Sequence, residues 1–488
     1  MYPNQLALNE LITQDLNEKK YFSRQSWCSP QKFSGHKVYD VIIVGAGHTG
    51  LALAHQLRLL GLGRVLLLDK QPCGKPGPWQ DFARMEKLRT SKFSQGPECG
   101  NPLLSFKFWK NSVDGPDAFD QIDFIKTEDW ANYLRWFKEI LQLDVESETE
   151  VFAQQWVESA NAFEIRAKKG NTERKYYSSM LCLATGMTAC GSWQAPKQLV
   201  NKTNLESIGY AWGKIDFSKL VGKHVAIIGG GASAFDNALE ATKHGAKRAD
   251  VLARRKIATG KPLSEKLWSG RDDSQIHDNE NTYPSDMTNP ILRFSNTLDE
   301  KKYLSVIRNF FSDGRTTSRP EYQKQFLGIN NLTVNEALGQ LKIEACKNSH
   351  QHRITSEHGF DELYDYVIVA TGPKFDVKAK KELFAISNEI LTWGDREQKV
   401  DLLDIDALPK LSSEYQIQFK SENSAAGKLY CLTDVIHITV GIPALANVIE
   451  KVSRSIASQL YANNAQHIIS HMEVLNNKGE EDNENYHS

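Results

Sequence analysis

Two glycine patterns, each directly after an apolar run, restrict the folds open to this chain of 488 residues. The first, GAGHTG, occupies residues 45–50 after the run YDVIIV, and the second, GGGASA, occupies residues 229–234 after HVAII. A near-continuous apolar run indicates a strand buried in a parallel sheet, and an apolar helical stretch follows each pattern. The order of strand, glycine turn, helix and second strand therefore predicts two separate βαβ units.

In the first unit each glycine has a physical task. Gly45 permits a tight turn, Gly47 lets the backbone approach a pyrophosphate, and Gly50 lets the helix pack closely on the strand. The amides at the start of that helix then bind the anion. Asp69 ends the next strand, with Lys70 after it, and a carboxylate there accepts hydrogen bonds from ribose hydroxyls. These five residues predict a dinucleotide site, which we assign to FAD.

The second unit ends its next strand differently, with Arg254 and Arg255 taken as the counterparts of Asp69. Basic side chains suit the 2′-phosphate of NADP, which a carboxylate would repel. The alternative is that both arginines are merely solvated. One unit with an acid and one with arginines predicts FAD at the first and NADPH at the second. The further predicted contacts in the second unit are Gly229, Gly231, Ser233 and Ala234.

The fold class expected is α/β, with two Rossmann-like dinucleotide-binding domains of the three-layer ββα type and the NADPH domain inserted into the FAD domain. A helix is predicted over 127–142, with Trp130, Tyr133, Leu134 and Phe137 on one face, and another at about 443–462. The predicted divisions are an N-terminal extension (1–36), the FAD domain (37–220 and 376–474), the NADPH domain (221–375, with an insertion at 257–345) and a disordered polar tail (475–488).

Composition excludes several other classes of protein. Lys and Arg total 59 and Asp and Glu total 60, so the balance of charge gives no support for a nucleic acid partner. The seven cysteines include no CxxC pair, which favours a reducing compartment and gives no indication of a metal site. Neither a secretory signal nor an apolar run long enough to span a bilayer is present, so we expect a soluble, cytoplasmic protein.

With these motifs in place, residues 38–465 resemble the flavin-dependent monooxygenases that carry both FAD and NADPH. Gly77-Pro78-Trp79 follows Asp69 as in that superfamily, and ARMEKLRTSK (83–92) is similar to its flavin-facing segment. The resemblance implies a cofactor contact for Trp79 and catalytic, flavin- or NADP-facing roles for Arg89 and Lys92. Arg89 stands where many members have Asn, which puts the role of that Asn in doubt here. The patterns GPW…ARM and GASAFDNA…RR also resemble a bacterial group of FAD/NAD(P)-binding proteins.

Two further segments carry the resemblance. IKTEDWANYLRWFKEIL looks like a segment of the lysine and ornithine N-hydroxylases, and Tyr133 and Trp136 match the Tyr and Trp of that segment; the alternative is that both fill a core. Asp434 resembles the Asp that contacts the flavin ribityl chain. The Phe-x-Gly-x-x-x-His motif is missing between 186 and 229, which argues against a Baeyer–Villiger enzyme.

The resemblance implies that NADPH reduces FAD, that a C4a-hydroperoxyflavin forms with O2, and that a small substrate is oxygenated at an amine nitrogen or a sulfur. A homo-oligomer is compatible with it. Three alternatives stay open: an NADPH-flavin reductase or oxidase without oxygen insertion, a disulfide reductase, and a flavin-binding sensor without catalysis. The disulfide reductase is disfavoured because Cys182 and Cys190 are not spaced as a redox pair.

Overall fold

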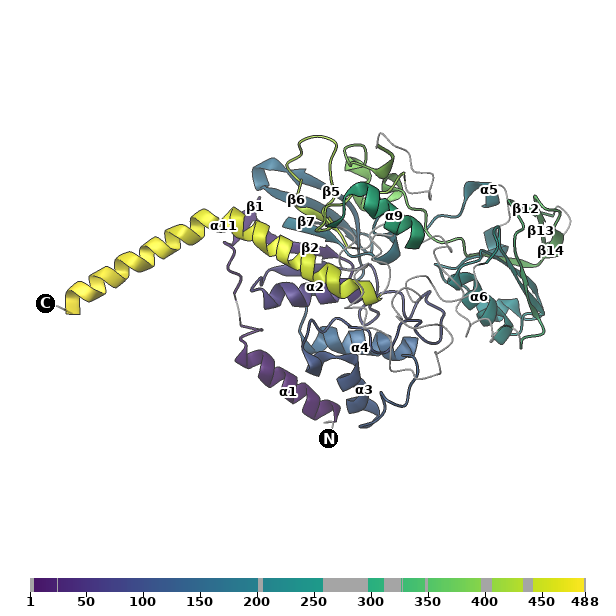
Figure 1. The fold of residues 1–488 in the computed structure, drawn as a ribbon, viewed down its shortest axis with the longest axis horizontal. Coiled ribbons are helices and arrows are strands. Elements are labelled where there is room, and N and C mark those ends of the chain that lie inside the picture. The colour runs from purple at the N-terminus through teal and green to yellow at the C-terminus, as the bar shows by residue number, and fades with distance from the viewer. Residues whose placement is uncertain are drawn as a thin grey trace.

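The computed structural model describes residues 4–23, 25–200, 205–257, 297–310, 326, 328–346, 350–395, 406–432 and 442–486. Figure 1 shows a larger body around β2 and α2 and a smaller one around α6, with chain segments crossing between them. The larger body is built around a mixed sheet and the smaller one around a parallel sheet, and each has its own buried apolar clusters. The α/β class predicted from the sequence is confirmed.

The sheet of the larger body is mixed. Its order is β4-β3-β2-β7-β6-β5, and β1 and β16 pair with β2 and β7 respectively. The pairs among β4, β3, β2, β7 and β16 are parallel, whereas β5, β6 and β7 form an antiparallel extension. The strand bounds are β1 (Gln31–Phe33), β2 (His36–Val44), β3 (Val65–Leu68), β4 (Val145–Glu146), β5 (Thr149–Val157), β6 (Ala162–Lys169), β7 (Thr172–Leu183) and β16 (Leu429–Cys431).

The smaller body contains a wholly parallel sheet of order β11-β10-β9-β15-β8 and a small antiparallel sheet of order β12-β13-β14. Parallel strands buried on both faces explain the apolar runs in the sequence. The bounds are β8 (Ile208–Tyr210), β9 (His224–Ile228), β10 (Arg248–Leu252), β11 (Leu332–Asn335), β12 (Leu341–Ala345), β13 (His352–Ser356), β14 (Asp361–Tyr364) and β15 (Tyr366–Val369).

In the two βαβ units, α2 and α6 follow the predicted pattern. The bounds of the described helices are α1 (Gln5–Glu18), α2 (His48–Leu59), α3 (Phe106–Asp114), α4 (Thr127–Ile140), α5 (Lys197–Val200), α6 (Ala232–Lys243), α9 (Glu300–Phe310) and α11 (Ile442–Tyr486). The predicted apolar face of α4 is confirmed, because its Trp130, Tyr133, Leu134 and Phe137 are all buried. Within the described residues, no helix is long and apolar enough to cross a membrane.

The segment expected as an N-terminal extension contains a helix that packs into the first core. Asn4 begins α1, its side chain accepting a hydrogen bond from the amide of Ala7. Leu8, Ile12 and Leu16 then lie on one face at helical spacing, and all three are buried in the same cluster as β2 and α4. Residues 5–18 therefore form part of the first body.

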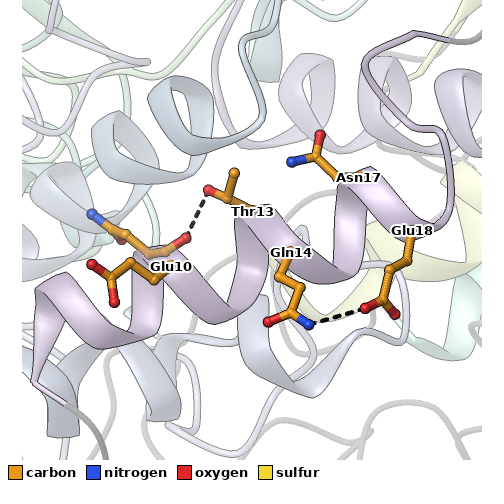
Figure 2. A pocket seen from close by; sticks show the side chains of 6 residues that line it. Glu10, Thr13, Gln14, Asn17 and Glu18 are labelled. Atoms are coloured by element: carbon orange, nitrogen blue, oxygen red, sulfur yellow. Dashed lines mark hydrogen bonds between the residues drawn. The ribbon is translucent and has the colours of Figure 1, made fainter.

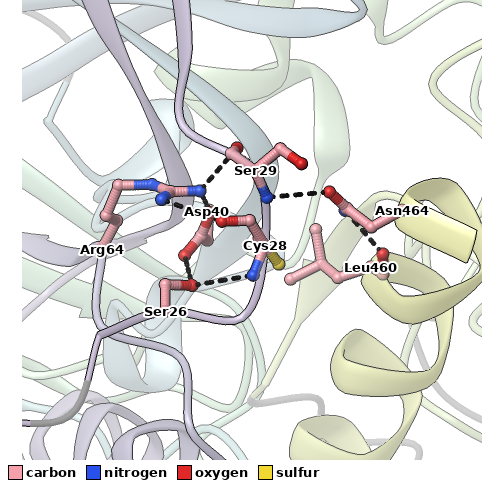
Figure 3. A network of polar contacts seen from close by, with 7 residues as sticks. All are labelled: Ser26, Cys28, Ser29, Asp40, Arg64, Leu460 and Asn464. Atoms are coloured by element: carbon pink, nitrogen blue, oxygen red, sulfur yellow. Dashed lines mark hydrogen bonds and ion pairs between the residues drawn. The ribbon is translucent and has the colours of Figure 1, made fainter. Parts of the chain in front are cut away.

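Polar contacts hold the rest of this segment against the sheet and the last helix (Figure 3). The Arg64 guanidinium pairs with the buried Asp40 carboxylate of β2 at 2.5 Å and donates to the carbonyl of Ser29 at 2.9 Å. The amide of Ser29 donates to Asn464 of α11 at 3.0 Å. Segments from both ends of the chain thus meet beside β2.

Three other boundaries differ from the predicted ones. The strand β8, at 208–210, pairs with β15, so the second sheet begins before residue 221. The expected insertion at 257–345 contributes β11 to the edge of that same sheet, while Tyr303 and Leu304 of α9 are buried in the first core. Helix α11 continues through Tyr486, across the tail predicted as disordered, and its end projects from the body in Figure 1.

The packing of α1 gives a direct test. Replacing Ile12, which has no exposed surface, by Ala should lower the free energy of unfolding by about 2–5 kcal/mol, because it leaves a cavity in the core. Leu11→Ala is the matched control: the neighbouring Leu11 is 47% exposed, so its loss should change stability by no more than about 0.5 kcal/mol. Denaturant unfolding of both variants measures this, and equal small effects would mean that α1 does not belong to the folded body.

Candidate dinucleotide-binding site

The first glycine turn (residues 45–50) is closed by the backbone of a neighbouring strand end. Gly45 has φ +106°, and a Cβ placed on it would lie 2.5 Å from the carbonyl oxygen of Ala184. A Cβ on Gly50 would collide with the carbonyl of Gly45. The amide of Gly45 donates to the carbonyl of Leu68 at 2.8 Å. Glycine is therefore required at 45 and at 50, as the sequence predicted from the motif.

The second glycine turn (residues 229–234) repeats this geometry. Gly229 has φ +144°, and a Cβ there would collide with the carbonyl of Ala370. Its amide donates to the carbonyl of Leu252 at 3.0 Å, as Gly45 does to Leu68. Ala184 and Ala370 are the first residues of the two ATG sequences, so each ATG supplies the wall of one glycine turn.

Helices α2 and α6 start directly from these turns. Their N-cap residues are Gly47 and Gly231, and neither has a side chain that caps the helix. No side chain therefore competes for the amides at the start of either helix, although in α6 the amide of Ala234 donates to the carbonyl of Gly231 at 2.9 Å. Such helix starts are the arrangement that binds a pyrophosphate. Ser233 is exposed on the first turn of α6, whereas Ala234 is fully buried and lets this helix pack closely on its sheet.

Asp69 is tied to the first glycine turn. One carboxylate oxygen accepts from the amide of Ala46 at 2.5 Å and the other from the amide of Gln71 at 2.7 Å. Burial raises the pKa of the Asp69 carboxyl, and the two backbone hydrogen bonds act in the opposite direction. A carboxylate has about four acceptor positions, so lone pairs remain for ribose hydroxyls. The neighbouring Lys70 is exposed.

The register of the two sheets changes the correspondence expected for the second unit. Because Gly45 bonds to Leu68 and Gly229 to Leu252, the structural counterpart of Asp69 is Ala253, and Arg254 and Arg255 come one and two positions later. The Ala253 methyl faces Gly230, lying 3.1 Å from a Cβ built there. Both arginines are exposed beside this turn. The second unit thus has an alanine in place of the carboxylate, followed directly by two arginines.

The Gly-Pro-Trp segment lies against the first glycine turn. A Cβ on Gly47 would be 3.5 Å from the Cα of Gly77, and Gly77 has φ +67° with the Trp79 ring beside it. The indole Nε1 of Trp79 is buried and has no hydrogen-bond partner among the described residues. An orphaned donor next to the turn fits a bound dinucleotide, which would supply an acceptor.

His48, the first residue of α2, is a feature that the sequence did not single out. Its ring stacks on Trp130, with centroids 5.4 Å apart and an interplanar angle of 23°. Its Nδ1 is buried without a hydrogen-bond partner in the described part of the chain. Burial lowers the pKa of His48 to about 3, so the ring beside the turn is neutral at physiological pH.

The segment 83–92 contacts the smaller body through two arginines, and its position facing the flavin stays a prediction. The guanidinium of Arg84 donates to the carbonyls of Ala211 and Gly213, each at 2.5 Å. Arg89 pairs with both carboxylate oxygens of Asp236 on α6, at 2.6 and 2.5 Å. These contacts join the larger body to the smaller one, and the contact of Arg89 is with α6, the helix that starts at the second glycine turn.

Lys92 is held by a different group of backbone atoms. Its ammonium donates to the carbonyls of Phe119, Asp120 and Ile122 at 3.1, 3.3 and 2.6 Å. Lys92 therefore closes the loop after α3, and Arg89 joins the two bodies. The catalytic roles of these two residues stay predictions.

The aromatic residues of α4 have core positions. Tyr133 is fully buried and donates to the carbonyl of Leu104 at 2.8 Å, and Trp136 donates to Asn9 of α1 at 2.8 Å. These contacts favour the core alternative for both. Asp434 lies outside the described residues.

A hollow of about 490 Å³ among the described residues lies along α1. Figure 2 shows that polar side chains of α1, among them Glu10, Thr13 and Gln14, line it. It is open to solvent and none of its lining residues belongs to either glycine turn, so we do not assign it to a cofactor.

Comparison with known proteins supports a flavin-dependent oxidoreductase. Residues 42–268 match the family described as pyridine nucleotide-disulphide oxidoreductase. An FAD-dependent urate hydroxylase from Xanthomonas campestris pv. campestris is 28% identical over 464 residues, covering 91% of each protein. The predicted relationship to flavin monooxygenases, and the class of oxidoreductase that it implies, are confirmed.

Solved structures agree with this class at the level of the fold. Ornithine hydroxylase from Pseudomonas aeruginosa superposes with a TM-score of 0.64 at 17% identity, covering 87% of this chain and all of that chain. Ornithine N-hydroxylase from Kutzneria sp. 744 gives a TM-score of 0.63 at 14% identity, covering 88% of this chain and 100% of its own. The chain has the fold of the N-hydroxylating flavin monooxygenases.

The Arg89–Asp236 pair can be tested against a second ion pair between the same two elements. Arg89→Ala removes the guanidinium beside a carboxylate that is 7% exposed, so we expect a loss of about 2–4 kcal/mol in unfolding free energy. Lys243→Ala is the control, because its pair with Glu86 spans 3.7 Å and both side chains are more than half exposed. That loss should stay below about 1 kcal/mol. Equal losses in denaturant titrations would contradict the assigned role of Arg89.

His48 predicts a pH dependence. In the unfolded chain its pKa returns to about 6.5, so the unfolded state takes up a proton below that pH while the folded state does not until about pH 3. Stability should therefore fall as pH decreases through this window, by up to about 1.4 kcal/mol per pH unit. Unfolding of His48→Asn between pH 6.5 and 4.5 should show a shallower decline than the parent protein. His36→Asn, at an exposed position, should retain the parent slope.

Proposed function

We propose that this chain binds FAD at the first glycine turn and NADPH at the second, and that it is an NADPH-dependent flavoprotein monooxygenase. The observation that carries the proposal is the pair of matching turns, in which Gly45 and Gly229 have the same backbone contacts but different partners at the following strand end. Asp69 borders the first turn and Ala253 the second. Two equivalent turns with opposite preference for negative charge suit two different dinucleotides.

The residues at each turn fit their proposed cofactor. Asp69 is fixed by two amides and retains acceptor positions for the ribose of FAD, and Trp79 offers a buried donor beside Gly47. At the second turn a 2′-phosphate would meet no carboxylate at position 253, and the exposed Arg254 and Arg255 supply positive charge. When bound, FAD would accept hydride from NADPH and activate O2. The chain supplies binding, orientation and exclusion of water.

Oxygenation of a small substrate is proposed because the FAD-dependent hydroxylase matches nearly the whole chain, including both turns. The names of the relatives indicate nitrogen compounds, so we propose a small molecule with a nucleophilic nitrogen, or a sulfur in its place, with O2 as co-substrate. A group of buried aromatic side chains near α2 limits the access of water from that side: Phe106, Trp109, Phe119, Trp130 and Tyr133. We further propose a cytoplasmic enzyme that can form a homo-oligomer, with no nucleic acid partner.

The first experiment is an anaerobic titration of the purified holoprotein with NADPH, followed by air. Loss of the oxidised flavin absorbance, and consumption of NADPH coupled to product with urate, ornithine, lysine or a thioether, is the expected result. NADPH consumption matched by hydrogen peroxide with every substrate would favour the reductase or oxidase alternative. Protein that holds flavin but is not reduced by NADPH would contradict the assignment of the second turn.

Ala253→Asp tests why the second turn would select NADPH. The new carboxylate would occupy the place that Asp69 has in the first unit, beside Gly230, and would repel a 2′-phosphate. We expect the preference for NADPH over NADH to fall by about tenfold or more, equivalent to about 1.4 kcal/mol, in anaerobic flavin reduction. Ala253→Ser, without charge, is the control and should keep most of the preference. An unchanged preference in Ala253→Asp would place the 2′-phosphate elsewhere.

A further inference from the structure

Two buried cysteines from distant parts of the chain meet at the end of the first sheet. The Sγ atoms of Cys190 and Cys431 are 2.9 Å apart, although 241 positions separate the residues in the sequence. Their side chains are 2% and 0% exposed, and both are thiols in this structure. Sequence spacing draws attention to Cys182 and Cys190, whereas the fold pairs Cys190 with a different residue.

The strand order explains why these sulfurs meet. Cys431 is the last residue of β16, paired in parallel with Leu183 at the end of β7. The chain leaves β7 through Ala184 and a 3-10 turn, η3 (Gly186–Thr188), and the amide of Ala189 bonds back to Gly186 at 3.0 Å. This turn returns the chain to the end of β16. Cys190 therefore lies beside the end of β16, the short strand that pairs with the end of β7.

Cys190 also precedes the contact between the two chain segments that cross from one sheet to the other. Ser192 and Lys374 exchange both backbone hydrogen bonds, at 3.0 and 2.9 Å, in an antiparallel bridge. Gly191 is required beside it, because a Cβ there would collide with the carbonyl of Lys374. A bond at Cys190 would thus act on the crossing that connects the two sheets.

We propose that Cys190 and Cys431 form an oxidisable pair, converted by hydrogen peroxide into a disulfide that fastens this crossing to β16. A disulfide has an S–S distance of about 2.05 Å, so the two sulfurs need to approach by less than about 1 Å. One thiolate attacks the peroxide, the O–O bond breaks, and a sulfenic acid and water result. The second thiolate displaces the sulfenic oxygen, which leaves as a second water. Two thiols are oxidised and one peroxide is reduced.

This pair does not depend on the proposed monooxygenase activity, because peroxide can be added from outside. The bond would close a loop that contains the whole parallel sheet β11-β10-β9-β15-β8. Such a cross-link restricts the unfolded chain and restrains the crossing in the folded one. A thiol reductant restores the two cysteines.

The test starts with the unaltered full-length protein, so it needs no variant to fold. The protein is reduced, freed of reductant, treated with hydrogen peroxide, and digested after its remaining thiols are alkylated under denaturing conditions. We expect a linked pair of peptides that contain Cys190 and Cys431, released by dithiothreitol. Alkylation of both cysteines after peroxide treatment, or linkage of either to another cysteine, would overturn the proposal.

Variants identify the partners. Cys190→Ser and Cys431→Ser should each abolish the linked peptides, while Cys182→Ser, at a neighbouring buried position in β7, should retain them. Hydrogen exchange of the oxidised protein should slow in residues 186–192 and 372–376 compared with the reduced protein. Equal exchange in the two forms would overturn the restraint on the crossing.

Discussion

The contact on which both bodies depend is the close approach of a strand-end carbonyl to a glycine: Ala184 to Gly45, and Ala370 to Gly229. No side chain fits between these atoms, so each turn stays tight and each following helix starts at the edge of its sheet. The helix amides and the end of the next strand then converge on the same edge. The position of the proposed cofactor sites follows from this one steric condition, repeated in two sheets.

Two guanidinium groups of the larger body contact the smaller body, which carries the second glycine turn. Arg84 holds the carbonyls of Ala211 and Gly213, and Arg89 holds Asp236 within α6. One nitrogen of Arg89 contacts both oxygens of Asp236, and the two terminal nitrogens of Arg84 donate to two separate carbonyls, so several hydrogen bonds hold this segment against the smaller body. Segment 83–92 therefore positions the bodies, and hydride transfer between two dinucleotides requires such a defined arrangement.

Several residues acquired a different meaning once their partners were known. Tyr133 and Trp136 resemble a functional segment, but their hydrogen bonds go to Leu104 and Asn9 in the interior. The polar appearance of residues 1–36 hides the three apolar positions with which α1 packs into the first core. Arg254 is one residue past the counterpart of Asp69, because strand register, which sequence distance only approximates, decides which residues align.

The sequence by itself determined the features that depend on neighbouring residues. These are the two glycine turns, the buried parallel strands before them, the apolar face of α4 and the relationship to flavin monooxygenases. Backbone sterics and hydrophobic periodicity act over a few residues, so they can be read without a fold. Only the tertiary structure decided that Arg89 meets Asp236, that Ala253 replaces Asp69 and that Cys190 meets Cys431. The two contacts join distant segments, and the equivalence of Ala253 and Asp69 depends on strand register. Sheet order and register, not spacing along the chain, therefore decide all three.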